Sequence, residues 1–273
     1  MAIRYSYCVA GPDVESETVT AFRGGWKEAV AALAEMGYHG IELVVKDVSN
    51  IESTELERVL AANGLALAAI CTGEIFGEDG LSFTSPAAGV RQAAAERVMA
   101  CLDLAGRLGG AVTIGRVRGA YAPEMSKDET ERLALDAFRR LSAHAAQCGS
   151  RLVLEPINRF QCNFINTVAE GLEWVEKVGS SQFQLMLDVF HLNIEERAVP
   201  EAIERAGQHV KMVHVCSNQR HAPGEGHLPW AQIRKALEQV NFDGFLSGEI
   251  INWVDDRGAA QKTITFLKKV FES

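Results

Sequence analysis

The sequence has no excess of positive charge and no long apolar run. Its 273 residues carry a formal net charge of −9, with a pI near 5.4. Because nucleic-acid binding depends on neutralising phosphates, this balance argues against a DNA or RNA partner and against an anionic membrane surface. No apolar stretch approaches the roughly 20 residues that span a bilayer, and the N-terminal MAIRYSYCVAG has no signal-peptide core. We therefore expect a cytoplasmic protein without a membrane partner.

Closely spaced cysteine pairs and the common motifs of nucleotide-binding proteins and serine hydrolases are also missing. The six cysteines are scattered and form no CxxC pair, so we interpret them as reduced thiols. No P-loop, GxGxxG or GxSxG motif is present. Their absence weakens nucleotide-binding and serine-hydrolase interpretations.

The sequence does contain a regular alternation of short apolar runs and amphipathic stretches. The strand-like runs lie near 3–8, 40–45, 65–71, 111–115, 151–155, 183–188, 210–215 and 244–249. The helix-like stretches lie near 26–36, 53–63, 87–108, 129–148, 167–178, 200–208, 230–240 and 256–271. Alternation predicts a parallel sheet, and eight units without a break in composition predict a single (β/α)8 TIM barrel domain over residues 1–273. Residues 72–90 form the longest loop-like insertion and could act as a lid.

Four of the strand-like runs carry a potential metal ligand near their C-terminal end. These residues are Glu155, Asp188, His214 and Glu249. In a (β/α)8 barrel all these strand ends open into one mouth, so the four side chains should converge there. Three carboxylates and one imidazole held together repel each other and lose hydration, and a divalent cation removes both costs. The donors suit Mn²⁺ or Mg²⁺ and tolerate Co²⁺ or Zn²⁺, and we predict one such ion, with Mn²⁺ favoured.

The motifs around these residues resemble the xylose-isomerase-like barrel superfamily of sugar isomerases and epimerases, and most closely its D-tagatose/D-psicose 3-epimerase branch. The motifs are GIEL (40–43), EPINRF (155–160), LDVFHLNIEE (187–196), HVCSNQR (214–220), PGEGHLPW (223–230) and GEI (248–250). The resemblance covers essentially the whole chain. It implies that the four predicted ligands bind Mn²⁺ or Co²⁺, and that Glu155 and Glu249 also form the acid/base pair. It further implies that His191 and Arg220 hold substrate oxygens.

C3 epimerisation of a ketose makes physical sense with these groups. A divalent ion polarises the C2 carbonyl and stabilises the developing enediolate, an effect worth several kcal/mol. Inverting C3 requires a proton to leave one face and another to return on the opposite face. Two carboxylates on opposite sides of the sugar, Glu155 and Glu249, are expected to do this. His191 and Arg220 are expected to hydrogen-bond oxygens near the reacting carbons.

The sequence departs from the 3-epimerases that it resembles at Gln161, where they carry a glutamate after the phenylalanine of EPINRF. That position helps to anchor the terminal hydroxyl end of the substrate, so a neutral amide indicates a different or anionic sugar. Arg116 and Arg118 alternate at the end of the fourth strand and should share one face. An arginine there could clamp a carboxylate or phosphate. Gln161, Arg116 and Arg118 are therefore candidates for binding the substrate. If they do, sugar acids or sugar phosphates should react better than neutral ketoses. The alternative is that the two arginines form ordinary ion pairs with acidic residues of the helices.

Several other functions stay open at this point. An aldose–ketose isomerase of the hydroxypyruvate-isomerase type would use the same metal and glutamates. A lyase of the inosose-dehydratase type would eliminate water at the same site. A DNA-repair endonuclease of this fold would call for more than the seven histidines present and a basic surface, and a non-catalytic binding protein would not need both glutamates. The expected partner is a small sugar or sugar derivative, with a homodimer or homotetramer as the possible assembly.

Overall fold

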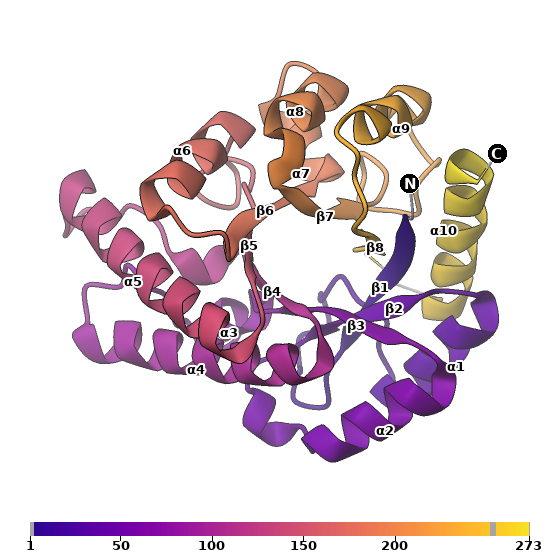
Figure 1. Cartoon of the computed structure of the whole chain (residues 1–273), viewed down its shortest axis with the longest axis horizontal. Coiled ribbons are helices and arrows are strands. Elements are labelled where there is room, and N and C mark those ends of the chain that lie inside the picture. The colour runs from indigo at the N-terminus through magenta and orange to yellow at the C-terminus, as the bar shows by residue number, and fades with distance from the viewer. Residues whose placement is uncertain (1–2, 252–254, 273) are drawn as a thin grey trace.

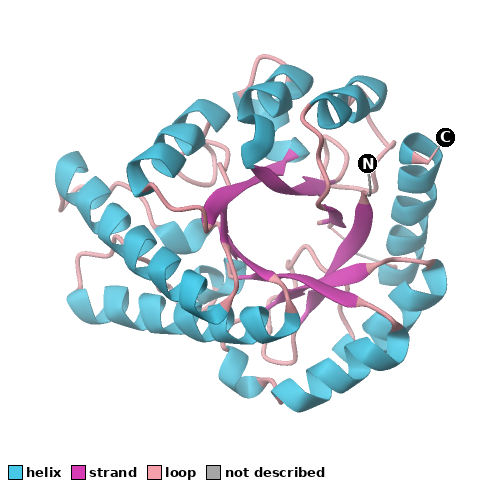
Figure 2. Ribbon diagram, in the orientation of Figure 1, coloured by secondary structure: helices cyan, strands magenta, loops and turns pink. Residues whose placement is uncertain are grey.

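Eight parallel strands close into a barrel that follows the order of the sequence, with β1 pairing to both β2 and β8. The computed structural model describes residues 3–251 and 255–272. The strands are β1 (Arg4–Ala10), β2 (Gly40–Val44), β3 (Ala66–Cys71), β4 (Ala111–Ile114), β5 (Leu152–Leu154), β6 (Phe183–Asp188), β7 (Val210–Val215) and β8 (Phe245–Gly248). Figure 2 shows these strands as a ring inside the helices. The predicted (β/α)8 barrel is confirmed.

The helices surround this ring (Figure 1). They are α1 (Trp26–Met36), α2 (Ser53–Asn63), α3 (Gly73–Gly77), α4 (Ala88–Leu108), α5 (Lys127–Cys148), α6 (Val168–Val178), α7 (Val189–Glu195), α8 (Val199–Ala206), α9 (Trp230–Gln239) and α10 (Asp256–Phe271). Three short 3-10 helices are η1 (Val48–Asn50), η2 (Arg116–Arg118) and η3 (Gly207–His209). Within the described ranges, no helix has the length and apolarity needed to cross a membrane.

Local signals in the sequence set several helix boundaries. Thr167 and Glu170 form a capping box at the start of α6, in which each side chain accepts a hydrogen bond from the other residue's backbone N–H. Gly179 ends the same helix in the left-handed conformation, with a φ of 69° that favours glycine.

Three elements on the C-terminal side of the barrel were not evident in the sequence. Helix α3 lies inside the predicted loop 72–90. Helix α7 begins directly after β6, because the Asp188 carboxylate accepts a hydrogen bond from the Phe190 N–H at 2.8 Å and caps it. Strand β4 ends at Ile114, and the chain then turns into η2.

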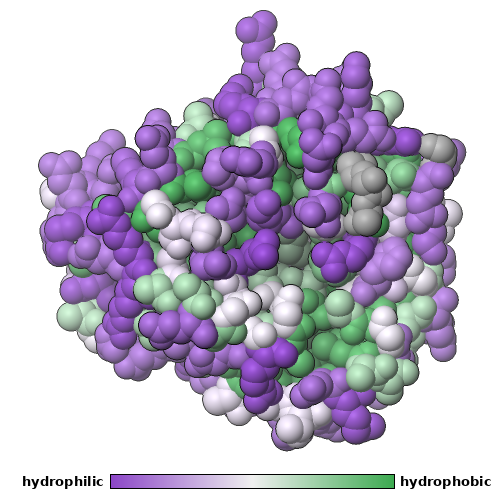
Figure 3. Space-filling view, viewed as in Figure 1, coloured by the Kyte–Doolittle hydropathy of each residue, from purple (hydrophilic) through white to green (hydrophobic). Residues whose placement is uncertain are grey.

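An apolar plug fills the inside of the barrel below the mouth. It consists of Ala68, Ala69, Val153, Met186, Met212 and Phe245. Because side chains alternate along a strand, the residues two positions after Val153, Met186 and Met212 face the same interior. Those residues are Glu155, Asp188 and His214. The larger core cluster includes buried residues from both the strands and the surrounding helices, and in Figure 3 hydrophilic side chains cover most of the rim of the molecule.

Candidate metal centre and active site

Four side chains from neighbouring strands meet at the C-terminal end of the barrel. Asp188 ends β6 and His214 lies near the end of β7, whereas Glu155 and Glu249 directly follow β5 and β8. One ligand atom from each of the four lies within 4.8 Å of those of the other three. The structure thus places the predicted ligand set around one point.

A cavity of about 610 Å³ opens above this cluster. Glu155, Glu249, His191 and Arg220 line it. Asp188 and His214 are 0% and 1% exposed and lie beneath its floor. Two of the carboxylates can therefore reach a molecule in the cavity, while Asp188 and His214 are buried and do not line it.

The His214 imidazole joins the cluster to a second layer of polar groups. Its Nδ1 atom lies 3.0 Å from Oε2 of Glu249 and 3.6 Å from Oε1 of Glu155. Its Nε2 atom lies 2.8 Å from Oε2 of Glu42. Burial by itself lowers the pKa of His214, but the negative charges of Glu42 and Glu249 outweigh burial and hold this pKa well above its usual value.

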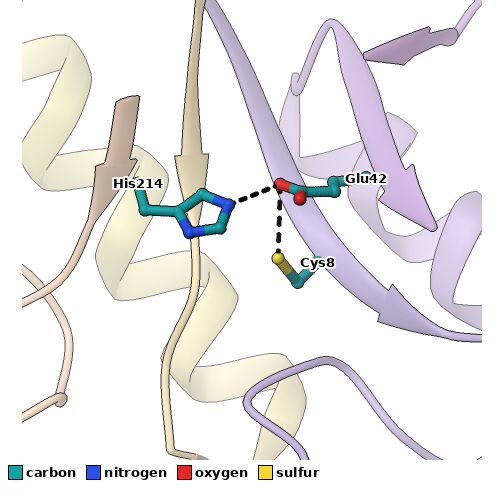
Figure 4. A group of neighbouring side chains, drawn as sticks. All are labelled: Cys8, Glu42 and His214. Carbon is teal, nitrogen blue, oxygen red and sulfur yellow. Dashed lines mark hydrogen bonds and ion pairs between the residues drawn. The ribbon is translucent and has the colours of Figure 1, made fainter. Parts of the chain in front are cut away.

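Glu42 supports the site and is a residue that the sequence analysis missed. It lies in the middle of β2, is 0% exposed, and also accepts a hydrogen bond from Sγ of Cys8 at 3.5 Å. Figure 4 shows Glu42 between Cys8 and His214. A metal-bound histidine usually donates its other ring N–H to a carboxylate, and Glu42 is placed to accept that hydrogen bond. The available signal was an acid inside the otherwise apolar run GIELVV.

The donor set fits a divalent cation. Glu42 accepts a hydrogen bond from Nε2 of His214, so Nδ1 is the nitrogen that faces the carboxylates, and a cation bound there would replace the second proton that the raised pKa favours. Although Nδ1 is only 3.0 Å from Glu249, it is buried without a well-aligned hydrogen bond. Nδ1 faces three carboxylates but is poorly aligned to donate a hydrogen bond to any of them. This position suits a metal ligand better than a hydrogen-bond donor.

Arg220 lies between two of the carboxylates. Its guanidinium donates one hydrogen bond to Asp188 and another to Glu249, and it stacks 4.7 Å from the ring centroid of Phe190. The other Glu249 oxygen accepts a hydrogen bond from Oγ1 of Thr20 at 2.8 Å. Burial raises the pKa of Glu249, but the charges of Arg220 and His214 outweigh burial and hold this pKa well below its usual value. Glu249 is therefore ionised.

His191 presents a defined nitrogen to the cavity. The Oδ1 atom of Asn158 accepts a hydrogen bond from the Phe160 N–H at 3.0 Å, so its Nδ2 group is the donor to Nδ1 of His191 at 2.8 Å. Burial lowers the pKa of His191, so the ring is neutral and its proton sits on Nε2. Nε2 lies 3.6 Å from Oε1 of Glu155 and is free to donate to an oxygen in the cavity.

Gln161 and Arg116 line the cavity, but Arg118 does not. The expectation that Arg116 and Arg118 share one face is wrong, because the chain leaves the extended conformation after Ile114 and forms η2. Arg118 is 0% exposed, which excludes it as a direct substrate ligand. Its guanidinium donates to the carbonyl oxygens of Gly115, Glu155, Phe164 and Ile165 at 2.8–3.0 Å. Arg118 therefore ties the loops after β4 and β5 together.

Comparison with known proteins agrees with this architecture. The family described as Xylose isomerase-like TIM barrel matches residues 30–270. The chain belongs to this family. Within it, the chain is 32% identical over 241 residues to an L-ribulose 3-epimerase of Mesorhizobium japonicum, covering 87% of this chain and 80% of that protein.

Other relatives match over shorter segments or by structure. The chain is 40% identical over 111 residues to a D-psicose 3-epimerase of Enterocloster bolteae, which is 41% of this chain and 37% of that protein. The chain thus spans less than half the length of the first curated relatives that it matches. A solved structure of an L-ribulose 3-epimerase superposes with a TM-score of 0.83 at 26% identity, covering 100% of this chain and 95% of that one.

Proposed function

We propose that the chain is a divalent-metal-dependent sugar epimerase that inverts C3 of a ketose or keto-sugar derivative. The observation that carries the proposal is the cluster of three carboxylates and one imidazole within 4.8 Å, at the base of a cavity. The names of the relatives, D-psicose 3-epimerase and L-ribulose 3-epimerase, support the same reaction class. Mn²⁺ is the ion we favour, and Co²⁺, Mg²⁺ or Zn²⁺ would suit the same donors.

Glu155, Asp188, His214 and Glu249 would hold the ion. When bound, a divalent cation would polarise the sugar carbonyl and offset the negative charge that develops on its oxygen. Glu42 keeps His214 in the ring orientation and tautomer that this role needs.

Glu155 and Glu249 are placed to move the proton at C3. They follow β5 and β8, which are three strands apart around the ring, so they reach the cavity from different sides. One glutamate removes the C3 proton from one face of the sugar, and the other returns a proton to the opposite face. The roles exchange for the other epimer, because the proton then begins on the other side. The low pKa of Glu249 keeps it in the carboxylate form that can accept a proton.

His191 and Arg220 are placed to orient and polarise the reacting part of the sugar. Both line the cavity beside the carboxylates. The Nε2–H of His191 can donate to a hydroxyl or carbonyl oxygen, and the Arg220 guanidinium offers fixed N–H donors from its stacked position over Phe190. Such preorganised donors lower the energy of an oxygen that gains negative charge.

Proton NMR in D₂O tests the proposal. Protein loaded with Mn²⁺ is incubated with a panel of ketoses, keto-sugar acids and ketose phosphates, and protein stripped with a chelator serves as the control. We expect deuterium to enter at C3 while the C3 epimer appears, and we expect the stripped protein to be inactive.

The same spectra separate the alternative reactions. Deuterium at C1 or C2 together with an aldose would assign an aldose–ketose isomerase. Loss of water from the substrate would assign a lyase of the inosose-dehydratase type. Metal-loaded protein that exchanges no proton with any sugar would overturn the enediolate mechanism.

A further inference from the structure

A second polar group lines the cavity on the side opposite the proposed metal centre. Glu74 lies in α3, after β3, and Arg116 lies in η2, after β4. Both line the same cavity as Glu155 and Glu249. The metal cluster is built from β5 to β8, so a sugar held there by its reacting carbons would extend its remaining carbons toward the side of β1 to β4, where Glu74 and Arg116 lie.

Glu74 is a largely buried carboxylate that lines the cavity and meets no hydrogen-bond donor from the residues that the structure describes. It is 8% exposed, yet none of the hydrogen bonds or ion pairs found in residues 3–251 and 255–272 engages its side-chain oxygens. Glu42, by contrast, is bonded to His214 and Cys8. Burial raises the pKa of Glu74, although the charge of Arg116 opposes this effect. The carboxylate therefore lines the cavity without a donor from the described residues, and a ligand that fills the cavity could supply donors to it.

Arg116 faces the same space. A Cβ atom on Gly77 would lie 2.4 Å from Oε2 of Glu74 and 2.9 Å from a terminal nitrogen of Arg116, so both groups border the space beside this glycine. No direct ion pair within 4.0 Å joins them in the described chain. The Arg116 guanidinium also lies 5.5 Å from the ring centroid of Phe76. The Glu74 carboxylate, a hydrogen-bond acceptor, and the Arg116 guanidinium, a donor of opposite charge, thus lie side by side in the lining of the cavity.

The backbone around Glu74 is fixed at both ends of α3. Oγ1 of Thr72 donates to the Thr113 carbonyl at 2.6 Å and ties the start of α3 to β4. Just after the helix, Glu78 accepts hydrogen bonds from the N–H groups of Glu15 and Ser16, both at 2.8 Å. Fixed groups lose little freedom when they bind a ligand, so this arrangement suits recognition.

Resting on the proposed epimerase function, we infer that Glu74 and Arg116 form a subsite that binds hydroxyl groups at the end of the sugar remote from the reacting carbons. The Glu74 carboxylate accepts hydrogen bonds from two neighbouring hydroxyls, and the Arg116 guanidinium donates to a third oxygen. A terminal carboxylate or phosphate would be repelled by Glu74 and would give it no hydrogen-bond donor. The subsite therefore selects a neutral polyhydroxyl end, in contrast to the anionic sugar that two arginines on one face had indicated.

The test compares a neutral 2-ketohexose with its 6-phosphate. We expect the wild-type enzyme to favour the neutral sugar at least tenfold in kcat/KM. Glu74→Gln should raise KM for the neutral sugar about tenfold with little change in kcat, and it should lower KM for the 6-phosphate. Gly77→Ala, which fills the space beside both groups, should also raise KM for the neutral sugar. Glu57→Gln, the same change on the exposed face of α2, is the matched control and should change neither value.

Calorimetric binding of an unreactive hexitol and its 6-phosphate separates this inference from the proposed function. If the protein epimerises neutral ketoses but Glu74→Gln leaves both KM values and hexitol affinity unchanged, the subsite is refuted and the epimerase stands. Preference of the wild-type enzyme for the phosphate would also refute it. If no ketose reacts but the hexitol binds, and binds more weakly to Glu74→Gln, the subsite stands and the epimerase fails.

Discussion

Arg118→Met separates a structural role from a substrate-binding role for an arginine next to the active site. Arg118 donates four hydrogen bonds to backbone carbonyls, of Gly115, Glu155, Phe164 and Ile165. Methionine fills part of the same volume but donates none of them. Leaving a buried acceptor without a donor costs about 1–3 kcal/mol.

The expected loss of stability is smaller than four such penalties. Burial lowers the pKa of Arg118, which means that the fold bears a cost for holding this charge away from water. The variant removes that cost together with the hydrogen bonds. We therefore expect the free energy of unfolding to fall by about 3–5 kcal/mol, which for a chain of this size lowers Tm by roughly 10 °C.

Thermal and urea unfolding followed by circular dichroism measure this loss. Arg116→Met is the matched control, because it makes the same chemical change two residues away at a partly exposed position that lines the cavity. The control should cost less than about 1 kcal/mol of stability and should act on KM instead. If Arg118→Met proved as stable as the wild type but bound its sugar more weakly, the structural assignment of Arg118 would be wrong.

Three further predictions concern the proposed centre. Glu42→Gln should weaken Mn²⁺ binding about 10–100-fold by isothermal titration calorimetry, because the support of His214 loses its charge; an unchanged Kd would contradict this role. Glu155→Gln and Glu249→Gln should each lower kcat about 10²–10⁴-fold in the NMR assay, and elemental analysis of bound metal shows whether the loss is in proton transfer or in metal binding. Asn158→Leu should lower kcat/KM about fivefold, as one hydrogen bond of about 1 kcal/mol orients His191; full activity would mean that packing alone holds the ring.

The barrel and the convergence of its four strand-end residues could be predicted from sequence because both follow from simple periodicity. Alternation along a strand places Glu155 on the same face as Val153 and Asp188 on the same face as Met186. Parallel strands that close in chain order bring their C-terminal ends to one mouth. Neither step depends on the exact length of a strand, so small errors in the predicted strand boundaries leave both predictions unchanged.

Arg118 could not be placed in this way because its position depends on where β4 stops. The strand ends at Ile114, and the turn into η2 changes the direction of every later side chain. Glu42 was missed for a different reason. It lies within β2, away from the strand ends that carry the four predicted ligands, and its role depends on contact with His214, 172 residues away in the chain.

Buried charges in this molecule differ in whether they bond to the protein or line the cavity, and the difference separates structure from function. Arg118 is surrounded by backbone carbonyls, and Glu42 is bonded to His214. Arg118 and Oε2 of Glu42 have partners within the protein, and neither residue lines the cavity, so both support the site from behind it. Glu74 is less completely buried, at 8% exposure, and it lines the cavity without a hydrogen-bond donor from the described residues. Because carboxylate oxygens that face a cavity and meet no protein donor are open to a ligand, the position of Glu74 identifies the ligand-binding surface more directly than its residue type does.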